Sequence, residues 1–127
     1  MKRVAVLMGG RSAEREVSLA TGKACAAALR EAGFDVQDVD LNGGGVPALM
    51  AALTPRPDVV FNALHGRFGE DGCIQGLLEW LEIPYTHSGV LASSLAMDKP
   101  ASLAVFQSRG IRTPEGRVVP LDAQEAS

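Results

Sequence analysis

Residues 4–18 read VAVLMGGRSAEREVS, and this stretch decides the fold. Five apolar residues predict a buried strand that stops at Gly9 and Gly10, after which the chain passes directly into a helix. This order places backbone N–H groups and the positive end of a helix dipole at the carboxyl end of a strand, where α/β proteins bind small anions. Glu14, however, puts a carboxylate where a phosphate would otherwise lie. The stretch therefore favours a carboxylate held ready for a cationic group over a simple phosphate cradle.

Length and composition narrow the class without choosing a function. The 127 residues are close to the commonest size of a single domain, and 46% hydrophobic with 21% charged residues is typical of a globular protein. A net charge of -3 gives no electrostatic footprint for nucleic acid. The longest apolar runs are far shorter than the ~20 residues that span a membrane. Residues 1–8 predict a first strand rather than a signal peptide, and we expect a cytoplasmic protein.

The two cysteines, Cys25 and Cys73, lie in apolar helical contexts without the spacing of a metal site. Free cysteines of this kind behave as small apolar residues. We therefore predict reduced, buried thiols.

Strand and helix patterns alternate along the chain, which predicts a doubly wound α/β fold: a parallel sheet with helices on both faces. The predicted strands cover residues 4–8, 36–40, 58–64, 84–86 and 118–121. The predicted helices cover residues 14–32, 46–53 and 73–82, then run from Val90, from Asp98 to Gly110, and from residue 122. The nearly continuous apolar run at 58–64 is expected to be the central strand.

Local signals define several helix ends and faces. Gly33 and Gly110 are predicted stops, Asp98 is a predicted N-cap, and Pro100 fits a first helical turn. The expected buried stripe of the helix at 14–32 consists of Val17, Ala20, Ala24, Ala27, Ala28 and Leu29.

The loop at residues 65–72, HGRFGEDG, is the second candidate site. It follows a predicted parallel strand at its carboxyl end, where such sheets bind ligands. The imidazole of His65 can serve as a hydrogen-bond donor or acceptor. Glu70 and Asp71 are expected to cap the helix from Cys73 and to fix the loop, rather than to contact a substrate.

Four segments together resemble D-alanine:D-alanine ligases, the ATP-grasp enzymes that make a dipeptide for peptidoglycan. They are GGRSAEREVS at 9–18, LHGRFGEDG at 64–72 followed by Gln75-Gly76, PYT at 84–86 with SGV at 88–90, and MDK at 97–99. They run through nearly the whole chain in the family's order. The resemblance implies a Rossmann-like, pre-ATP-grasp substrate domain at residues 1–97. Residues 98–127 would form a linker helix and the first elements of a truncated ATP-grasp central domain.

The resemblance also implies an activity and its residues. In these ligases ATP phosphorylates the carboxylate of one D-alanine, and the amine of a second D-alanine attacks the acyl phosphate. Glu14 matches the glutamate that orients the first D-alanine by its ammonium group, and is our candidate catalytic residue. His65 would reach the same substrate, while Val17 and Ser18 would shape its pocket. The alternative for Glu14 is a charge that merely complements a helix N-terminus.

Lys99 matches the first lysine of the ATP-grasp fold, which contacts nucleotide phosphates. Two departures stand nearby: Leu103 occupies a position where a basic residue is common, and His87 one often held by glycine. ATP and magnesium would be bound mainly by domains absent from this chain, so no metal ligand is assigned and the chain alone is expected to be inactive. Family members are typically homodimers, and the full-length protein is expected to be one.

Two other functions remain open. One is a stand-alone flavodoxin-like module that binds a nucleotide or phosphate at Gly9-Gly10, although neither a G-x-G-x-x-G nor a Walker pattern occurs. The other is a related ligase that uses D-lactate or D-serine as second substrate, because the residues that select that substrate lie beyond Ser127.

Overall fold

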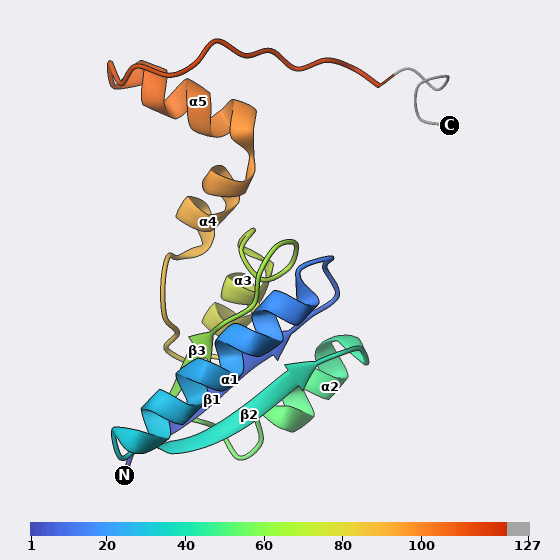
Figure 1. Ribbon diagram of the computed structural model, residues 1–127, viewed down its shortest axis with the longest axis vertical. Helices are drawn as coiled ribbons and strands as arrows, with labels where there is room; N and C mark the ends of the chain where they lie inside the picture. The colour runs from blue at the N-terminus through green and yellow to red at the C-terminus, as the bar shows by residue number, and fades with distance from the viewer. Residues whose placement is uncertain (122–127) are drawn as a thin grey trace.

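A computed structural model describes residues 1–121 and shows three strands and five helices (Figure 1). The strands are β1 (Arg3–Gly9), β2 (Asp35–Leu41) and β3 (Val59–Asn62). The helices are α1 (Arg15–Glu31), α2 (Gly45–Ala52), α3 (Cys73–Trp80), α4 (Val90–Met97) and α5 (Lys99–Ser108).

The three strands form one parallel sheet in the order β2-β1-β3. β1 pairs with β2 from Arg3 to Gly9, and with β3 from Val4 to Leu7. The prediction that residues 58–64 form the central strand is therefore wrong, because β1 has a full neighbour on both sides. The outer edge of β3 carries a single bridge, Val60 to Tyr85. A continuous apolar run indicates that both faces of a strand are buried, but it does not indicate how many strands pair with it.

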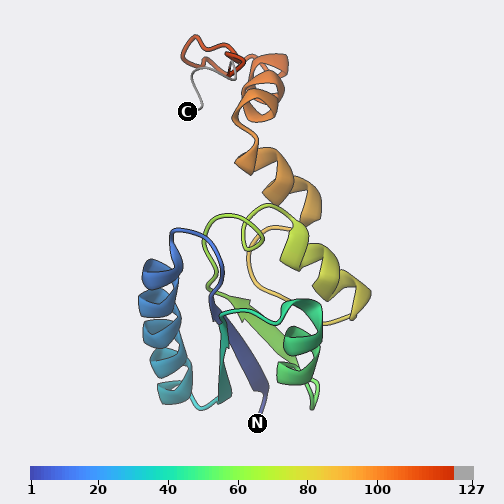
Figure 2. The same ribbon diagram turned by 90° about the vertical axis from the view of Figure 1, so that its right-hand side faces the viewer.

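Helices cover both faces of the sheet, as the doubly wound prediction requires. Figure 2 shows α1 on one side and α2 and α3 on the other. Successive residues of a strand point to opposite faces, so β1 serves two cores. Val4, Val6 and Met8 pack with Ala26 of α1. Leu7, on the other face, joins a cluster that contains Leu49, Leu53, Val60, Ile74, Leu78 and Ile83.

The buried face of α1 differs from the predicted stripe. The buried residues are Ser18, Gly22 and Ala26, whereas Val17 is exposed. A side chain at Gly22 would clash with Met8, so the helix lies directly against β1. Small residues set this close approach, and a stripe chosen by hydrophobicity alone misses them.

Three helices end in the same hydrogen-bond pattern, the Schellman motif. In α1 and α5 the left-handed residue is Gly33 (φ 92°) or Gly110 (φ 73°), as predicted. In α3 it is Glu82, with φ 54°. Its N–H bonds to the carbonyl of Glu79, and the N–H of Ile83 to that of Leu78.

The later segments depart from the sequence prediction in two places. Residues 84–86 contribute the one bridge of Tyr85 instead of a strand, and residues 118–121 are exposed and have no regular structure. Val118 and Val119 favour strands, but no strand edge lies beside them among the described residues, so they form no strand. The helix expected from residue 122 lies outside the described residues.

The helices α4 and α5 extend away from the sheet (Figure 1). Asp98 joins them and caps α5, because its Oδ1 accepts a hydrogen bond from the backbone N–H of Ala101 at 3.0 Å. This N-cap, and Pro100 in the first turn, confirm the prediction. No residue of α5 is buried, and Leu91 and Phe106 are exposed. The two helices therefore form an arm with little packing of its own.

Candidate functional site

The crossovers of the sheet define where a ligand site can form. The chain leaves β1 for α1 on one face, and leaves β3 for α3 on the other. Adjacent strands whose connections diverge in this way leave a crevice at their carboxyl ends, which is the usual ligand position in such sheets. Here the crevice lies between the loop at residues 10–14 and the loop at residues 63–72.

One serine joins these two loops. Ser12 Oγ donates a hydrogen bond to the backbone carbonyl of His65 at 2.9 Å and accepts one from the N–H of Glu14 at 3.1 Å. A methyl group on Gly66 would lie 2.6 Å from Glu14 Oε2 and 2.9 Å from Ser12 Oγ. Gly66 also has a φ of 72°, so glycine is required there twice over. Glu14 is thereby held beside the end of β3.

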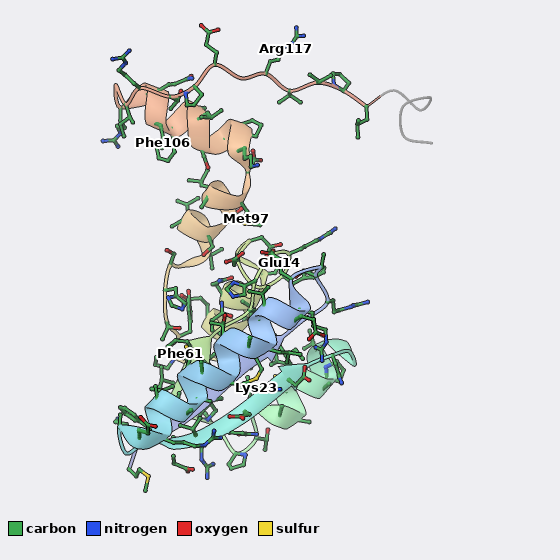
Figure 3. All side chains as sticks on the ribbon, in the orientation of Figure 1. Glu14, Lys23, Phe61, Met97, Phe106 and Arg117 are labelled. Atoms are coloured by element: carbon green, nitrogen blue, oxygen red, sulfur yellow. The ribbon has the colours of Figure 1, made fainter. Side chains whose placement is uncertain are left out.

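The Glu14 carboxylate is exposed and lies at the N-terminus of α1 (Figure 3). Glu14 directly precedes the first helical residue, Arg15, but its side chain makes no capping hydrogen bond. No cation among residues 1–121 pairs with it. The site therefore presents an uncommitted carboxylate in the crevice.

Arg15 ties the first loop to β2. Its Nη1 and Nη2 donate to Asp40 Oδ1 at 2.7 Å and Oδ2 at 2.9 Å, a two-pronged ion pair. The hydrogen bond from Arg15 lowers the pKa of Asp40 and, in return, raises the pKa of Arg15. A side chain on Gly9 would clash with both partners, which explains a glycine at the strand end.

His65 is half-buried between two polar neighbours. Its Nδ1 lies 3.5 Å from Glu70 Oε1, and its Nε2 lies 3.4 Å from Thr21 Oγ1 of α1. Glu70 Oε2 also accepts a hydrogen bond from the N–H of Gly66 at 2.7 Å. Glu70 therefore fixes the loop and orients the imidazole.

Asp71 closes the same loop. Its oxygens accept hydrogen bonds from the backbone N–H groups of Phe68 at 2.9 Å and Cys73 at 3.2 Å. Partial burial acts to raise the pKa of Asp71, but the hydrogen bonds from Phe68 and Cys73 outweigh it and the pKa is lowered. The prediction that Glu70 and Asp71 fix the loop is confirmed. The prediction that both cap α3 is correct only in part, because Asp71 alone bonds to Cys73 and the N-cap residue is Gly72.

Val17 and Ser18 occupy different environments. Val17 is 59% exposed on the turn of α1 that follows Glu14. Ser18 is 0% exposed, and its Oγ donates to the carbonyl of Ala63 at 2.7 Å and accepts from the N–H of Gly9 at 2.9 Å. The Ser18 hydroxyl thus joins the ends of β1 and β3, and its predicted part in shaping a substrate pocket stays a prediction.

Lys99 is the first residue of α5 and lies on the arm. It is exposed, and it does not line the cavity of about 430 Å³ formed by neighbouring residues of α4 and the loop at 64–70. The structure therefore brings Glu14 and His65 together and leaves Lys99 apart from them.

Sequence reasoning missed two buried amides that hold the second loop. Asn62 Nδ2 and Gln75 Nε2 both donate to the carbonyl of Gly69, at 2.9 and 3.0 Å. Gln75 Oε1 is buried and has no partner among residues 1–121. Gln75 is one of the residues that line a cavity of about 430 Å³, together with His65 and Glu70. The sequence did contain a signal for them, since Asn62 and Gln75 are each a single amide side chain within an otherwise apolar segment.

The cysteine prediction is correct only in part. Both thiols are free, but Cys25 is half-buried and Cys73 is exposed. Cys73 is the first residue of α3 and follows the loop at residues 65–72. Its thiol is exposed because it lies at the start of the helix and not in the helix interior.

Among residues 1–121, no group of three or more His, Cys, Asp and Glu side chains could hold a metal ion. Within the same residues, no helix is both long and apolar enough to cross a membrane.

Comparison with known proteins places this geometry in a family. Residues 47–88 match the family described as D-ala D-ala ligase N-terminus. The D-alanine–D-alanine ligase of Acidiphilium cryptum is 64% identical over 122 residues, which cover 96% of this chain and 40% of that protein. The corresponding protein of Cereibacter sphaeroides is 57% identical over 124 residues, covering 98% of this chain and 39% of its own length. This chain thus spans about two fifths of the length of these curated relatives.

Solved structures agree with the sequence matches. The crystal structure of the D-alanine–D-alanine ligase from Bacillus anthracis superposes with a TM-score of 0.81 at 38% identity, covering 91% of this chain and 37% of that one. The ligase from Coxiella burnetii gives a TM-score of 0.77 at 29% identity, covering 98% of this chain and 47% of that one. Over nearly its whole length, this chain is therefore similar to the N-terminal part of D-alanine–D-alanine ligases.

Proposed function

We propose that this chain is the substrate-binding N-terminal domain of an ATP-dependent D-alanine–D-alanine ligase, and that Glu14 holds the first D-alanine by its ammonium group. The observation that carries the proposal is the uncommitted Glu14 carboxylate, which Ser12 holds beside Gly66 and His65. An ammonium group that leaves water needs an ionised partner, and a carboxylate supplies one with strong hydrogen bonds.

The neighbouring residues take distinct roles in this proposal. His65, oriented by Glu70 and Thr21, offers an imidazole to the same D-alanine. Val17 gives the substrate an apolar wall, since its side chain is exposed one turn after Glu14. Ser18 acts through the backbone of Gly9 and Ala63, which it fixes.

The nucleotide site of the proposed enzyme rests mainly on other residues. Lys99 is the one described residue that the family resemblance matches to a phosphate contact, and it does not line the cavity of about 430 Å³ that Ala96 and Met97 help to form. A relative from Bacillus anthracis is known as a complex with ATP. We therefore assign ATP and Mg²⁺ mainly to the part of the relatives that this chain does not match. ATP would supply the phosphoryl group that activates the first D-alanine.

The domain division proposed from the sequence, 1–97 and 98–127, falls within the arm, between α4 and α5. Its helix α5 has no buried residue, so its apolar side chains are free to pack against a following domain. The homodimer of the full-length protein is part of the same proposal.

The experiment joins this chain to the remainder of the Acidiphilium cryptum ligase, the part that follows the matched region. The joined protein is expected to form D-alanyl-D-alanine from D-alanine, ATP and Mg²⁺, whereas the 127-residue chain alone is expected to form none. An inactive joined protein that folds, in an assay where the Acidiphilium ligase is active, would contradict the proposal. Dipeptide made by the chain alone would contradict the assignment as one domain of a larger site.

A further inference from the structure

A second cavity, of about 320 Å³, lies on the face of the sheet opposite α1. It is enclosed by the end of β2, the start of α2, the loop at 64–69 and α3. Its apolar lining consists of Leu41, Val46, Leu49, Leu64, Ile74 and Leu77. Neither Glu14 nor Val17 lines it. The volume is within the range of small-molecule sites, ~300–1,000 Å³, and is too small for a helix of a partner protein.

The charges that line this cavity are all basic. Arg11 and Arg67 line it, and no aspartate or glutamate does. Within residues 1–121 neither guanidinium lies within ion-pair distance of a carboxylate. Asp40, beyond the end of the cavity, is already bound to Arg15. In a chain with a net charge of -3, this cavity is therefore a place of local positive charge.

Phe68 adds a third feature. Its φ of 69° is a conformation that bulky side chains rarely adopt, and the ring nevertheless lines the cavity while remaining 47% exposed. The Arg67 guanidinium lies over this ring, with Cζ 4.9 Å from its centroid. The stacking orients the guanidinium beside an apolar surface.

We propose that this cavity binds an amphipathic organic carboxylate, with Arg11 and Arg67 holding the carboxylate and the apolar lining covering the hydrocarbon body. A carboxylate matches the planar fork of a guanidinium, and both arginines are free to meet it. Leu49, Leu64, Ile74 and Leu77 remove the hydrocarbon from water. This cavity adjoins the proposed D-alanine site: His65 lines it, whereas Glu14 does not, and the proposal rests on Arg11 and Arg67 and not on Glu14.

The test uses octanoate and the 127-residue chain labelled with ¹⁵N. Octanoate is expected to shift the amide signals of Gly10, Gly43 and Gly45, which line the cavity, and not that of Gly110 at the end of α5. Octanamide has the same hydrocarbon body without the charge, and is expected to bind at least about tenfold more weakly.

Two double variants separate the cavity from general electrostatics. Arg11→Gln with Arg67→Gln is expected to weaken octanoate binding by at least about tenfold. Arg109→Gln with Arg112→Gln makes the same change of charge at exposed residues outside the cavity and is expected to leave binding unchanged. The amide spectra of both variants report whether the fold is retained.

Three results would overturn the proposal. They are shifts at Gly110 as large as those at the cavity glycines, equal loss of binding in both double variants, and equal affinity for octanoate and octanamide. The last result would leave an apolar cavity without a preference for anions.

Discussion

Ser12 Oγ donates a hydrogen bond to the carbonyl of His65 at 2.9 Å, across 53 residues of sequence. The same hydroxyl accepts the N–H of Glu14. One side chain thus positions both loops of the crevice, and both residues proposed to hold the substrate.

Ser12→Ala is expected to lower the free energy of unfolding by about 1–2 kcal/mol, because the carbonyl of His65 and the N–H of Glu14 lose one partner each. Urea unfolding followed by circular dichroism measures this change. Ser108→Ala is the matched control, since Ser108 bonds only to Val105 of its own helix. Equal effects of the two variants on the free energy of unfolding would show that the hydrogen bond between the loops adds no more stability than a bond within one helix.

Glu82→Gly is expected to raise the free energy of unfolding by up to about 1 kcal/mol. Glu82 has the left-handed conformation that ends α3, and glycine adopts it without strain. Gly33→Ala, in the equivalent position after α1, is expected to lower stability by a similar amount. Thermal unfolding of the two variants checks both signs, and a lower melting temperature for Glu82→Gly would refute the explanation.

Stability is expected to fall as the pH drops through the acidic range. The lowered pKa values of Asp40 and Asp71 mean that the unfolded chain binds more protons than the folded chain below the ordinary carboxyl pKa of about 3.9. Their contribution is therefore present above that pH and is lost as the pH falls through the folded-state values.

Asp71→Asn tests this directly. The variant is expected to be less stable than the unmodified chain near neutral pH, with a difference that shrinks toward zero in acid, because protonation of Asp71 has by then removed the same charge. Urea titrations from neutral pH down to the acid limit of the fold measure the difference. A difference that stays constant over this range would assign the effect to shape and not to charge.

The sequence predicted the parts of the fold that depend on local chemistry. The apolar run before Gly9, the helix stops at Gly33 and Gly110, and the cap at Asp98 all appear in the structure. It did not predict the central position of β1, because strand order depends on contacts between distant segments. It also missed the buried face of α1, where Gly22 and Ser18 allow the helix to approach β1.

For the site, too, the sequence predicted local features but not the contacts between distant segments. The sequence drew attention to Glu14, His65 and the loop at 65–72, since charges and glycines after apolar strands are visible without a structure. The link through Ser12 and the orientation of His65 by Thr21 join residues 53 and 44 positions apart. At position 87 the family resemblance already indicated that glycine is common, and the structure supplies the reason: His87 has a φ of 73°, a conformation that favours glycine.

ATP is expected to bind this chain too weakly to register near physiological concentrations. Lys99 is the one residue that the family resemblance matches to a phosphate contact, and a single contact of this kind does not offset the cost of immobilising the ligand. Isothermal calorimetry of the 127-residue chain measures this. Micromolar affinity would instead favour a stand-alone nucleotide-binding module.

The central claim is that Glu14 holds the ammonium group of the first D-alanine, and Glu14→Gln in the joined protein tests it most directly. The amide keeps the shape and removes the charge, which costs on the order of 2–5 kcal/mol for a desolvated ion pair. The kcat/KM for D-alanine is then expected to fall roughly 30-fold to several-thousand-fold, while the affinity for ATP hardly changes. Glu16→Gln, which removes a neighbouring exposed charge from the first turn of α1, is expected to leave both unchanged. A kcat/KM for Glu14→Gln within about threefold of the unmodified protein would contradict the claim and leave Glu14 as a charge at a helix terminus.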